Sequence, residues 1–234
     1  MTQLTYLQNP DLFSANAKIL EILKTENVVQ IVLDQTIFYV QGGGQPSDTG
    51  IIKNMTAEFE VTKVFRDENG KILHSGNFTT GKFEIGQEAE LIVDQAKRNL
   101  HSKIHSDGHL LDLAIQKSGL NWIPGKGFHF VVGSYVEYQI PKNTSQDLNL
   151  EDLKNTIQAH FDELVNQKLP FKISFDETQT FHGEPLRKIK IGNEIECPCG
   201  GTHAKNTSEL AGFKITKIKL KSGIARVSYG LVDL

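Results

Sequence analysis

Two widely separated pairs of metal-ligand side chains place the strongest constraint on how this chain can fold. His105 and His109 form the first pair, and Cys199 and His203 form the second, with the same four-residue spacing. Their nitrogen and sulfur atoms are ligands that a tetrahedral zinc ion takes from proteins. Each pair alone is weak support, because histidines four apart on a helix are often only neighbours on one face. If both pairs bind one ion, two distant segments must meet, and a metal-dependent reaction becomes the first hypothesis.

The first pair falls in a segment with helical periodicity. Apolar residues recur with the spacing of a helix from Asp94, a candidate N-cap, to Gly119. Residues four apart project from nearly the same side of a helix, so His105 and His109 can bind one ion. His101 extends the same row by one turn. Spacing alone does not decide whether the ligand pair is His101 and His105 or His105 and His109.

The second pair lies in segment 196–203, which reads Glu-Cys-Pro-Cys-Gly-Gly-Thr-His. Its glycines permit the tight reversal that brings a thiolate and an imidazole onto one ion. Cys197 and Cys199 are the only cysteines and stand too close for an ordinary structural disulfide. We therefore expect a reducing compartment with thiolate available for metal, and we keep Cys197 as an alternative ligand.

Other metal signatures fit the sequence less well. The metalloprotease helix needs a glutamate directly after its first histidine, whereas Ser106 follows His105. The zinc deaminase pattern is imitated by His-Gly-Glu at 182–184 and by Cys199, but Thr202 stands where its second cysteine belongs. Four protein ligands usually make a closed structural site, so the constellation does not by itself favour catalysis.

Residues 1–93 have the pattern of short strands separated by turns. The segments with β-branched or alternating apolar residues are 28–33, 36–40, 58–65, 71–74 and 88–93. Within this region we expect one short helix at 15–24, with Ser14 as its cap. The sequence therefore predicts a β-barrel-like domain over residues 1–93.

Residues 94–234 mix helices with strands. A second helix is expected from about 150 to 167, after the candidate cap Asn149. The later strands, the last two of which form a hairpin, are expected at 127–140, 171–175, 188–191, 213–220 and 224–231. We predict an α+β protein in which the β-barrel-like domain is followed by an α+β domain, residues 94–234, with an antiparallel sheet and a zinc site.

The net charge argues against a protein that holds nucleic acid through its overall charge. Lysine plus arginine minus aspartate plus glutamate gives 25 − 28 = −3. A local patch remains, because residues 205–226 carry six basic residues with Glu209 as their only acid. Lysines on an exposed strand would give the same pattern. The sequence shows neither an apolar run long enough for a bilayer nor a signal-peptide pattern, so we expect a cytoplasmic protein without a membrane partner.

Three segments together resemble the editing region of alanyl-tRNA synthetase. They are Asp-Gln-Thr-Ile-Phe-Tyr-Val-Gln-Gly-Gly-Gly-Gln-Pro-Ser-Asp-Thr-Gly at 34–50, His-Ser-Asp-Gly-His-Leu-Leu at 105–111, and Cys-Gly-Gly-Thr-His at 199–203. The resemblance covers nearly the whole chain, which looks like a free-standing relative of that region, a trans-editing protein of the AlaX family. A glycine-rich N-terminal domain without a synthetase catalytic core is similar to the medium-length AlaX class.

The resemblance implies a ligand set and a reaction. The second zinc histidine of the family is followed by an apolar pair, as His109 is, which implies His105, His109, Cys199 and His203 as Zn²⁺ ligands. It implies a hydrolase that removes serine, with glycine as a second candidate, from mischarged tRNA(Ala). Separately from the resemblance, we expect a monomer. The ion can acidify the attacking water or hold the aminoacyl group, and the sequence leaves both roles open.

The glycine-rich loop at 42–50 has two interpretations. Its composition alone is that of a simple β-turn. The resemblance favours contacts with the terminal adenosine or the aminoacyl group. It assigns the catalytic or polar contacts to Thr36, Gln45 and Asp48, and the backbone approach to Gly43, Gly44 and Gly50. The basic residues expected to contact tRNA are Lys205, Lys217 and Lys219.

Two other functional classes stay open at this point. A non-catalytic RNA-binding module with a structural zinc would contain the same four ligands. A nucleoside deaminase would release ammonia from cytidine or adenosine. The family pattern also has a glutamine before a Lys-Gly pair after the zinc helix, whereas residues 123–127 read Ile-Pro-Gly-Lys-Gly. Selectivity for serine would then be built differently in this chain.

Overall fold

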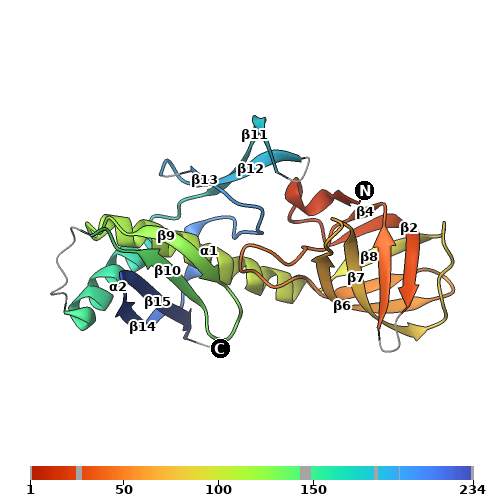
Figure 1. The fold of residues 1–234 in the computed structure, drawn as a ribbon, viewed down its shortest axis with the longest axis horizontal. Helices are drawn as coiled ribbons and strands as arrows, with labels where there is room; N and C mark the ends of the chain where they lie inside the picture. The colour runs from red at the N-terminus through yellow and green to blue at the C-terminus, as the bar shows by residue number, and fades with distance from the viewer. Residues whose placement is uncertain (1, 25–27, 143–148, 182–183, 195, 233–234) are drawn as a thin grey trace. The chain divides into compact units, whose positions relative to one another are not determined.

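The computed structural model describes residues 2–24, 28–142, 149–181, 184–194 and 196–232. The chain divides into two compact units, residues 1–100 and 101–234 (Figure 1). The protein is α+β, as predicted, whereas the predicted domain boundary after residue 93 stays a prediction. The deaminase-like segment 182–184 lies partly outside the described residues. No helix in the described ranges is long and apolar enough to cross a membrane.

A closed six-stranded barrel forms the body of the first unit. Its strands follow the order β2-β3-β7-β6-β5-β8, and every neighbouring pair is antiparallel. Alternate side chains of each strand fill the interior. The strands are β2 (Ser14–Lys24), β3 (Val29–Leu33), β5 (Gly50–Lys53), β6 (Glu58–Arg66), β7 (Ile72–Thr80) and β8 (Glu88–Val93). A short parallel pair, β1 (Gln3–Leu4) with β4 (Gln35–Thr36), and a 3-10 turn (Thr5–Leu7) complete the unit.

The helix predicted at 15–24 is wrong, because this segment is strand β2. Ala17 and Ile19 are buried while Asn16 and Lys18 face outward, so the true period is two. Ser14 does not cap a helix; it pairs with Ile92 of β8 as part of the barrel. A run of ten residues rich in alanine, isoleucine and leucine fits both periods, and barrel closure decides in favour of the strand.

The strand predicted at 36–40 is also largely wrong. Only Gln35–Thr36 is strand, as β4, and residues 37–40 form a loop whose apolar side chains are all buried in the core of the first unit. The Tyr39 amide donates to Asp48 Oδ2 at 2.7 Å instead of to a neighbouring strand. The apolar run therefore reflects burial and not sheet pairing.

The second unit contains two antiparallel sheets and most of helix α1. The helices are α1 (Gln95–Lys117) and α2 (Leu150–Asn166). The four-stranded sheet has the order β14-β15-β10-β9, with β9 (Ile123–Phe128), β10 (Tyr135–Gln139), β14 (Phe213–Lys221) and β15 (Ile224–Leu231). The three-stranded sheet consists of β11 (Phe171–Phe181), β12 (Glu184–Ile191) and β13 (Glu196–Pro198). A 3-10 turn at Thr207–Leu210 precedes β14.

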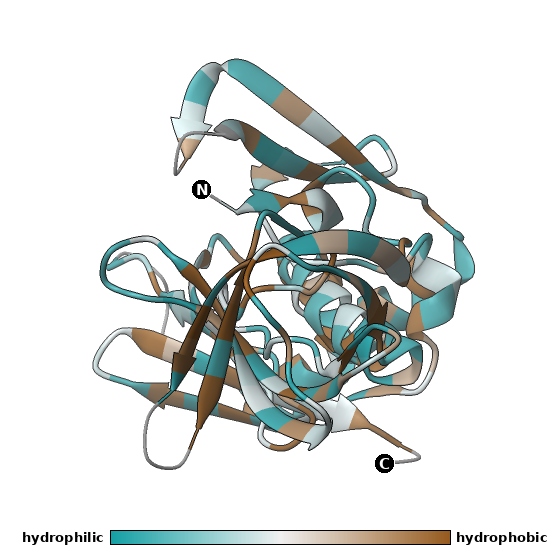
Figure 2. Ribbon diagram, turned by 90° about the vertical axis from the view of Figure 1, so that its right-hand side faces the viewer, coloured by the Kyte–Doolittle hydropathy of each residue, from teal (hydrophilic) through white to brown (hydrophobic). Residues whose placement is uncertain are grey.

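Local capping explains why the two helices begin where the sequence predicts. Asp94 Oδ1 accepts a hydrogen bond from the Lys97 amide at 3.1 Å, and the Asn149 side chain accepts from the amide of Glu151 at 3.1 Å. The hydrogen bond from Lys97 is also the main cause of the lowered pKa of Asp94. The predicted hairpin is present as β14 and β15. Apolar (brown) and polar (teal) residues both occur on the strands nearest the viewer in Figure 2.

Candidate metal centre

Helix α1 supplies two of the four candidate ligands. His105 and His109 lie one turn apart, and their ring centroids are 5.0 Å from each other. Their Nε2 atoms approach to 3.2 Å, so both nitrogens point at one place beside the helix. This is the arrangement expected for ligands four apart on a helix.

The loop that carries the second pair is tied to α1 by two serines of the helix. Ser102 Oγ lies 2.6 Å from Thr202 Oγ1. The Ala204 amide donates to Ser106 Oγ at 2.9 Å. Because all four of these groups are buried, the two bonds set the height of the loop along the helix. The two ligand pairs are therefore brought together partly by residues that are not ligands.

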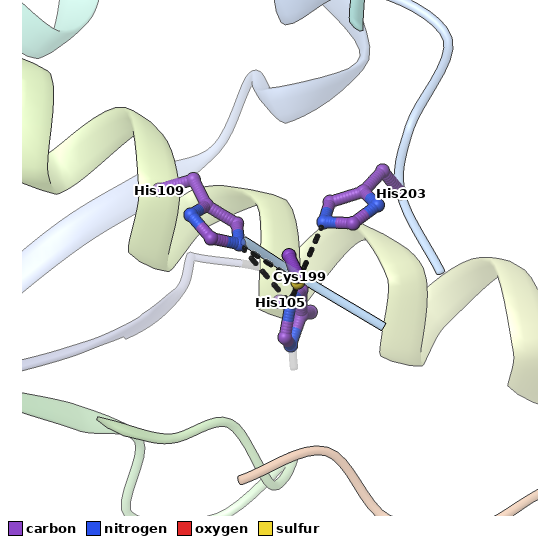
Figure 3. Close-up of side chains that lie close together, drawn as sticks. All are labelled: His105, His109, Cys199 and His203. Atoms are coloured by element: carbon purple, nitrogen blue, oxygen red, sulfur yellow. Dashed lines mark hydrogen bonds between the residues drawn. The ribbon is translucent and has the colours of Figure 1, made fainter. Parts of the chain in front are cut away.

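Four donor atoms converge between the helix and this loop (Figure 3). Cys199 Sγ lies 3.1 Å from His105 Nε2, 3.4 Å from His109 Nε2 and 3.5 Å from His203 Nε2. All four donors lie within 4.8 Å of one another. Zinc–nitrogen bonds of about 2.0–2.1 Å and a zinc–sulfur bond of about 2.3 Å require tetrahedral donor separations of about 3.3–3.6 Å. The donor set and its spacing fit a tetrahedral ion, so the cluster can hold a metal.

Burial keeps the three imidazoles of the cluster neutral. It lowers the pKa of His109 to about 4 and lowers the pKa values of His105 and His203 well below the usual value. The neighbouring imidazoles and Arg187 act in the same direction. Neutral imidazole is the form that binds a metal, so the protein supplies these ligands without having to remove protons from them.

The thiol of Cys199 is in the opposite situation. Burial raises its pKa, while the hydrogen bond from the Gly201 amide to Sγ, at 3.4 Å, and the charge of Arg187 lower it. Arg187 is itself held beside the loop, because its Nη1 donates to the Cys199 carbonyl at 2.6 Å. A cation at the cluster favours the thiolate strongly, so metal binding there displaces the thiol proton.

His101 and Cys197 lie outside the four-donor cluster. Cys197 lies on β13, and its Sγ is 3.6 Å from His109 Nδ1, the ring nitrogen opposite the cluster. Its pKa is raised to about 12, chiefly by burial. When Nε2 binds the ion, Nδ1 of His109 carries a hydrogen and can donate a hydrogen bond to this sulfur, which then orients the ring, as partners of metal-ligating histidines do.

His129 adjoins the cluster and was missed by the sequence reasoning. Its ring centroid is 4.8 Å from that of His105, and its Nδ1 is 2.6 Å from the hydroxyl of Tyr229. The ring fits because Gly108 and Gly127 have no side chains: a Cβ at either position would lie 2.4 Å or 2.3 Å from a ring atom. One feature of the sequence could have indicated this packing. Gly108 lies inside α1, and a glycine in a helix costs about 1 kcal/mol relative to alanine.

The glycine-rich loop turns back on itself through a two-residue turn. Gly42 and Gln45 exchange backbone hydrogen bonds of 3.3 Å and 2.9 Å around Gly43 and Gly44, whose φ angles are 53° and 78°. Positive φ at both central residues defines a type I′ turn and explains this pair of glycines. Gly50 serves a different purpose, since a Cβ there would lie 2.1 Å from the Ile92 carbonyl oxygen in the barrel wall.

The three polar candidates of this region are buried in the first unit, whereas the metal cluster belongs to the second. Thr36, Gln45 and Asp48 are each at most 1% exposed. Thr36 Oγ1 accepts from the Phe38 amide at 3.1 Å and lies 2.8 Å from His74 Nε2. Asp48 forms a buried ion pair with Arg98. These contacts hold the loop in place, and a catalytic role for the three residues stays a prediction.

Acid is expected to weaken the barrel through His74. Burial lowers the pKa of its ring to about 4, although a hydrogen bond with the Ile31 carbonyl raises it. The stabilisation is present above the unfolded value of about 6.5 and is lost as the pH falls towards 4, a difference of about 3 kcal/mol. Urea unfolding of the wild type and of His74→Gln across this range will measure it. Parallel pH curves for the two proteins would contradict the assignment.

The three predicted tRNA-contacting lysines lie at two places in the second unit. Lys217 and Lys219 are exposed on β14, where they pair with Ser228 and Arg226 of β15. Lys205 is exposed in the segment that follows His203. The lysines therefore lie on the surface, as a role in binding requires.

Two family models match separate stretches of the chain. The model described as tRNA synthetases class II (A) matches residues 9–97, which include the barrel. The model described as threonyl and alanyl tRNA synthetase second additional domain matches residues 186–227, which include Cys199 and His203. Fold and site thus define a protein built from domains that it shares with aminoacyl-tRNA synthetases.

Comparison with individual relatives identifies the family within this class of proteins. The alanyl-tRNA editing protein AlaX-M of Pyrococcus horikoshii is 33% identical over 227 residues, which cover 97% of this chain and 94% of the relative. AlaX-L of the same organism is 30% identical over 232 residues, or 95% of this chain and 56% of the relative. An alanine–tRNA ligase of Leptospira biflexa is 30% identical over 204 residues, or 80% of this chain and 21% of the ligase. The chain belongs to the AlaX family of alanyl-tRNA editing proteins.

Proposed function

We propose that the protein hydrolyses the ester bond between a wrong amino acid and the 3′ end of tRNA(Ala). Serine is the first candidate amino acid and glycine the second. The observation that carries the proposal is the convergence of His105, His109, Cys199 and His203 in a chain that aligns with nearly all of AlaX-M. Support for the class of RNA comes from the names of the relatives, which are alanyl-tRNA editing proteins and alanine–tRNA ligases.

The four-donor cluster would hold zinc, the ion that its nitrogen and sulfur atoms suit. When bound, zinc supplies Lewis-acid chemistry that either acidifies a water or fixes the aminoacyl group. The water oxygen attacks the ester carbonyl carbon, and the bond to the ribose oxygen breaks to give the free amino acid and the tRNA hydroxyl. The chain contributes neutral imidazoles at His105, His109 and His203, and Cys197 orients the ring of His109.

The glycine-rich loop completes the proposal. Gly42 and Gly43 are exposed at the tip of the type I′ turn, so their backbone groups are accessible to a bound adenosine or aminoacyl group. Thr36 and Asp48 would hold the residues around this tip in place through the buried contacts described above, and Gln45 through its backbone hydrogen bonds with Gly42. Backbone amides at a glycine turn can approach a ligand more closely than a residue with a side chain allows.

Deacylation assays test the proposed reaction directly. The protein should release serine from Ser-tRNA(Ala) faster than alanine from Ala-tRNA(Ala), and parallel assays with Gly-tRNA(Ala) rank the second candidate. Equal rates on the correct and the misacylated tRNA would rule out editing. Absence of ammonia release from cytidine and adenosine would separate the reaction from that of a nucleoside deaminase.

Charge removal at the exposed lysines should weaken the salt dependence of tRNA binding. Each phosphate contact adds about 0.7–0.9 to the slope of log affinity against log salt concentration. Lys205→Ala, Lys217→Ala and Lys219→Ala are each expected to lower the slope by about this amount. Filter binding at several salt concentrations measures it, with Lys82→Ala, an exposed lysine of the first unit, as the matched control. An unchanged slope in all three variants would remove these lysines from the RNA-binding surface.

A further inference from the structure

The outward face of the four-stranded sheet carries a row of stacked aromatic rings. Phe128 of β9 and Tyr135 of β10 are register partners, with ring centroids 5.6 Å apart and an interplanar angle of 16°. Phe130 stacks on Phe128 at 4.4 Å and 11°. The guanidinium of Arg226, on β15, lies 4.1 Å from the centre of the Tyr135 ring. We call Phe130, Phe128, Tyr135 and Arg226 the aromatic row.

The aromatic row is not part of the packed core. Along β10 and β15 the alternate residues Val136, Tyr138 and Val227 are buried, which places Tyr135 and Arg226 on the opposite face. Phe128, Phe130 and Tyr135 are all partly exposed, although their rings already cover one another. Among the described residues Phe130 ends the row with one stacked ring partner, so a further flat group can stack on its outer face.

The same face is positively charged. Lys217, Lys219 and Lys221 of β14 are exposed and lie in register with the outward residues of β15. Among the described strands of this sheet, Glu137 is the one acid on this face, and its Oε1 accepts from Arg226 Nε at 3.0 Å. A row of cations with one paired carboxylate therefore lies beside the stacked rings. This combination suits a polyanion that also has flat aromatic groups.

The aromatic row ends next to the metal cluster. Its residues Phe128, the last of β9, and Phe130 flank His129 in sequence, and the His129 ring packs against His105 at 4.8 Å between centroids. Because β9 is an edge strand, a flexible chain can pass around it from one face of the sheet to the other. The aromatic row is thus one residue away in sequence from the ring that packs against His105.

We propose that the aromatic row and the lysines of β14 bind unpaired nucleotides near the 3′ end of the tRNA substrate. This inference rests on the proposed function. Bases of single-stranded RNA stack on aromatic side chains and on arginine, while a basic surface follows the phosphates. Bases inside a duplex are already stacked on each other, so the rings select an unpaired segment. The phosphates complement the lysine charge, which makes RNA the occupant that this face fits.

Binding of two RNA hairpins to the full chain tests the proposal. One fluorescent hairpin carries a short unpaired 3′ extension, and the other has the same stem with a blunt end. The wild type should prefer the extended hairpin. The double variant Phe128→Leu/Phe130→Leu keeps apolar bulk but loses the rings, and it should bind the extended hairpin about fivefold to 150-fold more weakly. Its affinity for the blunt hairpin should not change.

A matched control and a small substrate separate this proposal from the proposed function. Phe181→Leu removes an exposed aromatic ring of β11 and should leave both affinities unchanged. Thermal melting and metal content, the same in all three proteins, exclude an effect through folding or through His129. Turnover of a seryl ester of adenosine should be equal in wild type and double variant, whereas the KM for Ser-tRNA(Ala) should rise only in the double variant.

The possible results each decide one question. Equal losses for the two hairpins, no loss at all, or a similar loss in Phe181→Leu would overturn the proposal, and so would a wild type without preference for the extended hairpin. If the wild type hydrolyses neither ester, the proposed function fails while the hairpin measurements still decide whether the aromatic row binds unpaired RNA.

Discussion

His105→Ala is expected to abolish deacylation of Ser-tRNA(Ala), with a loss in rate of about a thousand-fold or more. The side chain provides one of the four converging donors and is 2% exposed, so alanine at this position removes a buried nitrogen from the cluster. A bound metal contributes several kcal/mol to the transition state of a hydrolysis, which corresponds to a factor of this size. Elemental analysis of the purified variant and its steady-state rate are the two measurements.

The matched control is His101→Ala, one turn earlier on the same face of α1 and outside the four-donor cluster. It should keep both the metal and the activity. A full loss of activity in this control would show that the ligand set has been assigned incorrectly. His105→Ala that retains metal and turnover would contradict the proposed site itself.

The same variant separates an enzyme from an RNA-binding module with a structural zinc. In the module, loss of the metal should unfold the second unit, because structural zinc contributes folding energy outright. Circular dichroism of His105→Ala, and of wild-type protein treated with a chelator, reports this. A folded protein that has lost metal and turnover together identifies a catalytic ion. A wild-type protein that binds RNA but shows no measurable hydrolysis would favour the module.

Features that depend on a few neighbouring residues were predictable from the sequence. Helix α2 begins after Asn149 because its side chain accepts the amide hydrogens that would otherwise lack a partner. The helical period places His101, His105 and His109 in one row on α1, although it does not choose the ligand pair among them, and the hairpin of β14 and β15 follows from its turn. In each case the information lies within one or two turns of chain, where spacing determines geometry.

Features that depend on distant partners were not predictable. Segment 15–24 is a strand because β3 and β8 pair with both of its edges, and neither partner is encoded in the segment. The place of His129 depends on two glycines of other elements that make room for its ring. Likewise, the aromatic row exists only when β9, β10 and β15 are brought side by side.

Arg98→Met is expected to cause the largest loss of stability in the first unit, about 3–5 kcal/mol. Arg98 and Asp48 are each 1% exposed and form an ion pair in which Arg98 Nε lies 2.9 Å from Oδ1. The guanidinium also donates to the carbonyl of Ile37 at 2.7 Å and to that of Pro10 at 2.7 Å. Removing one partner of a buried pair leaves the other charge without compensation, and this is the source of the cost.

The double variant Arg98→Met/Asp48→Asn tests that explanation. Asparagine removes the uncompensated charge but keeps an oxygen for the Tyr39 amide, so much of the lost stability should return. Lys97→Met, at the neighbouring exposed position of α1, should change stability by less than about 0.5 kcal/mol. Hydrogen exchange of barrel amides measures all three.

A loss below about 1 kcal/mol in Arg98→Met would mean that the glycine-rich loop does not depend on this arginine for its position. A double variant as unstable as the single one would show that the lost hydrogen bonds, and not the unpaired charge, dominate.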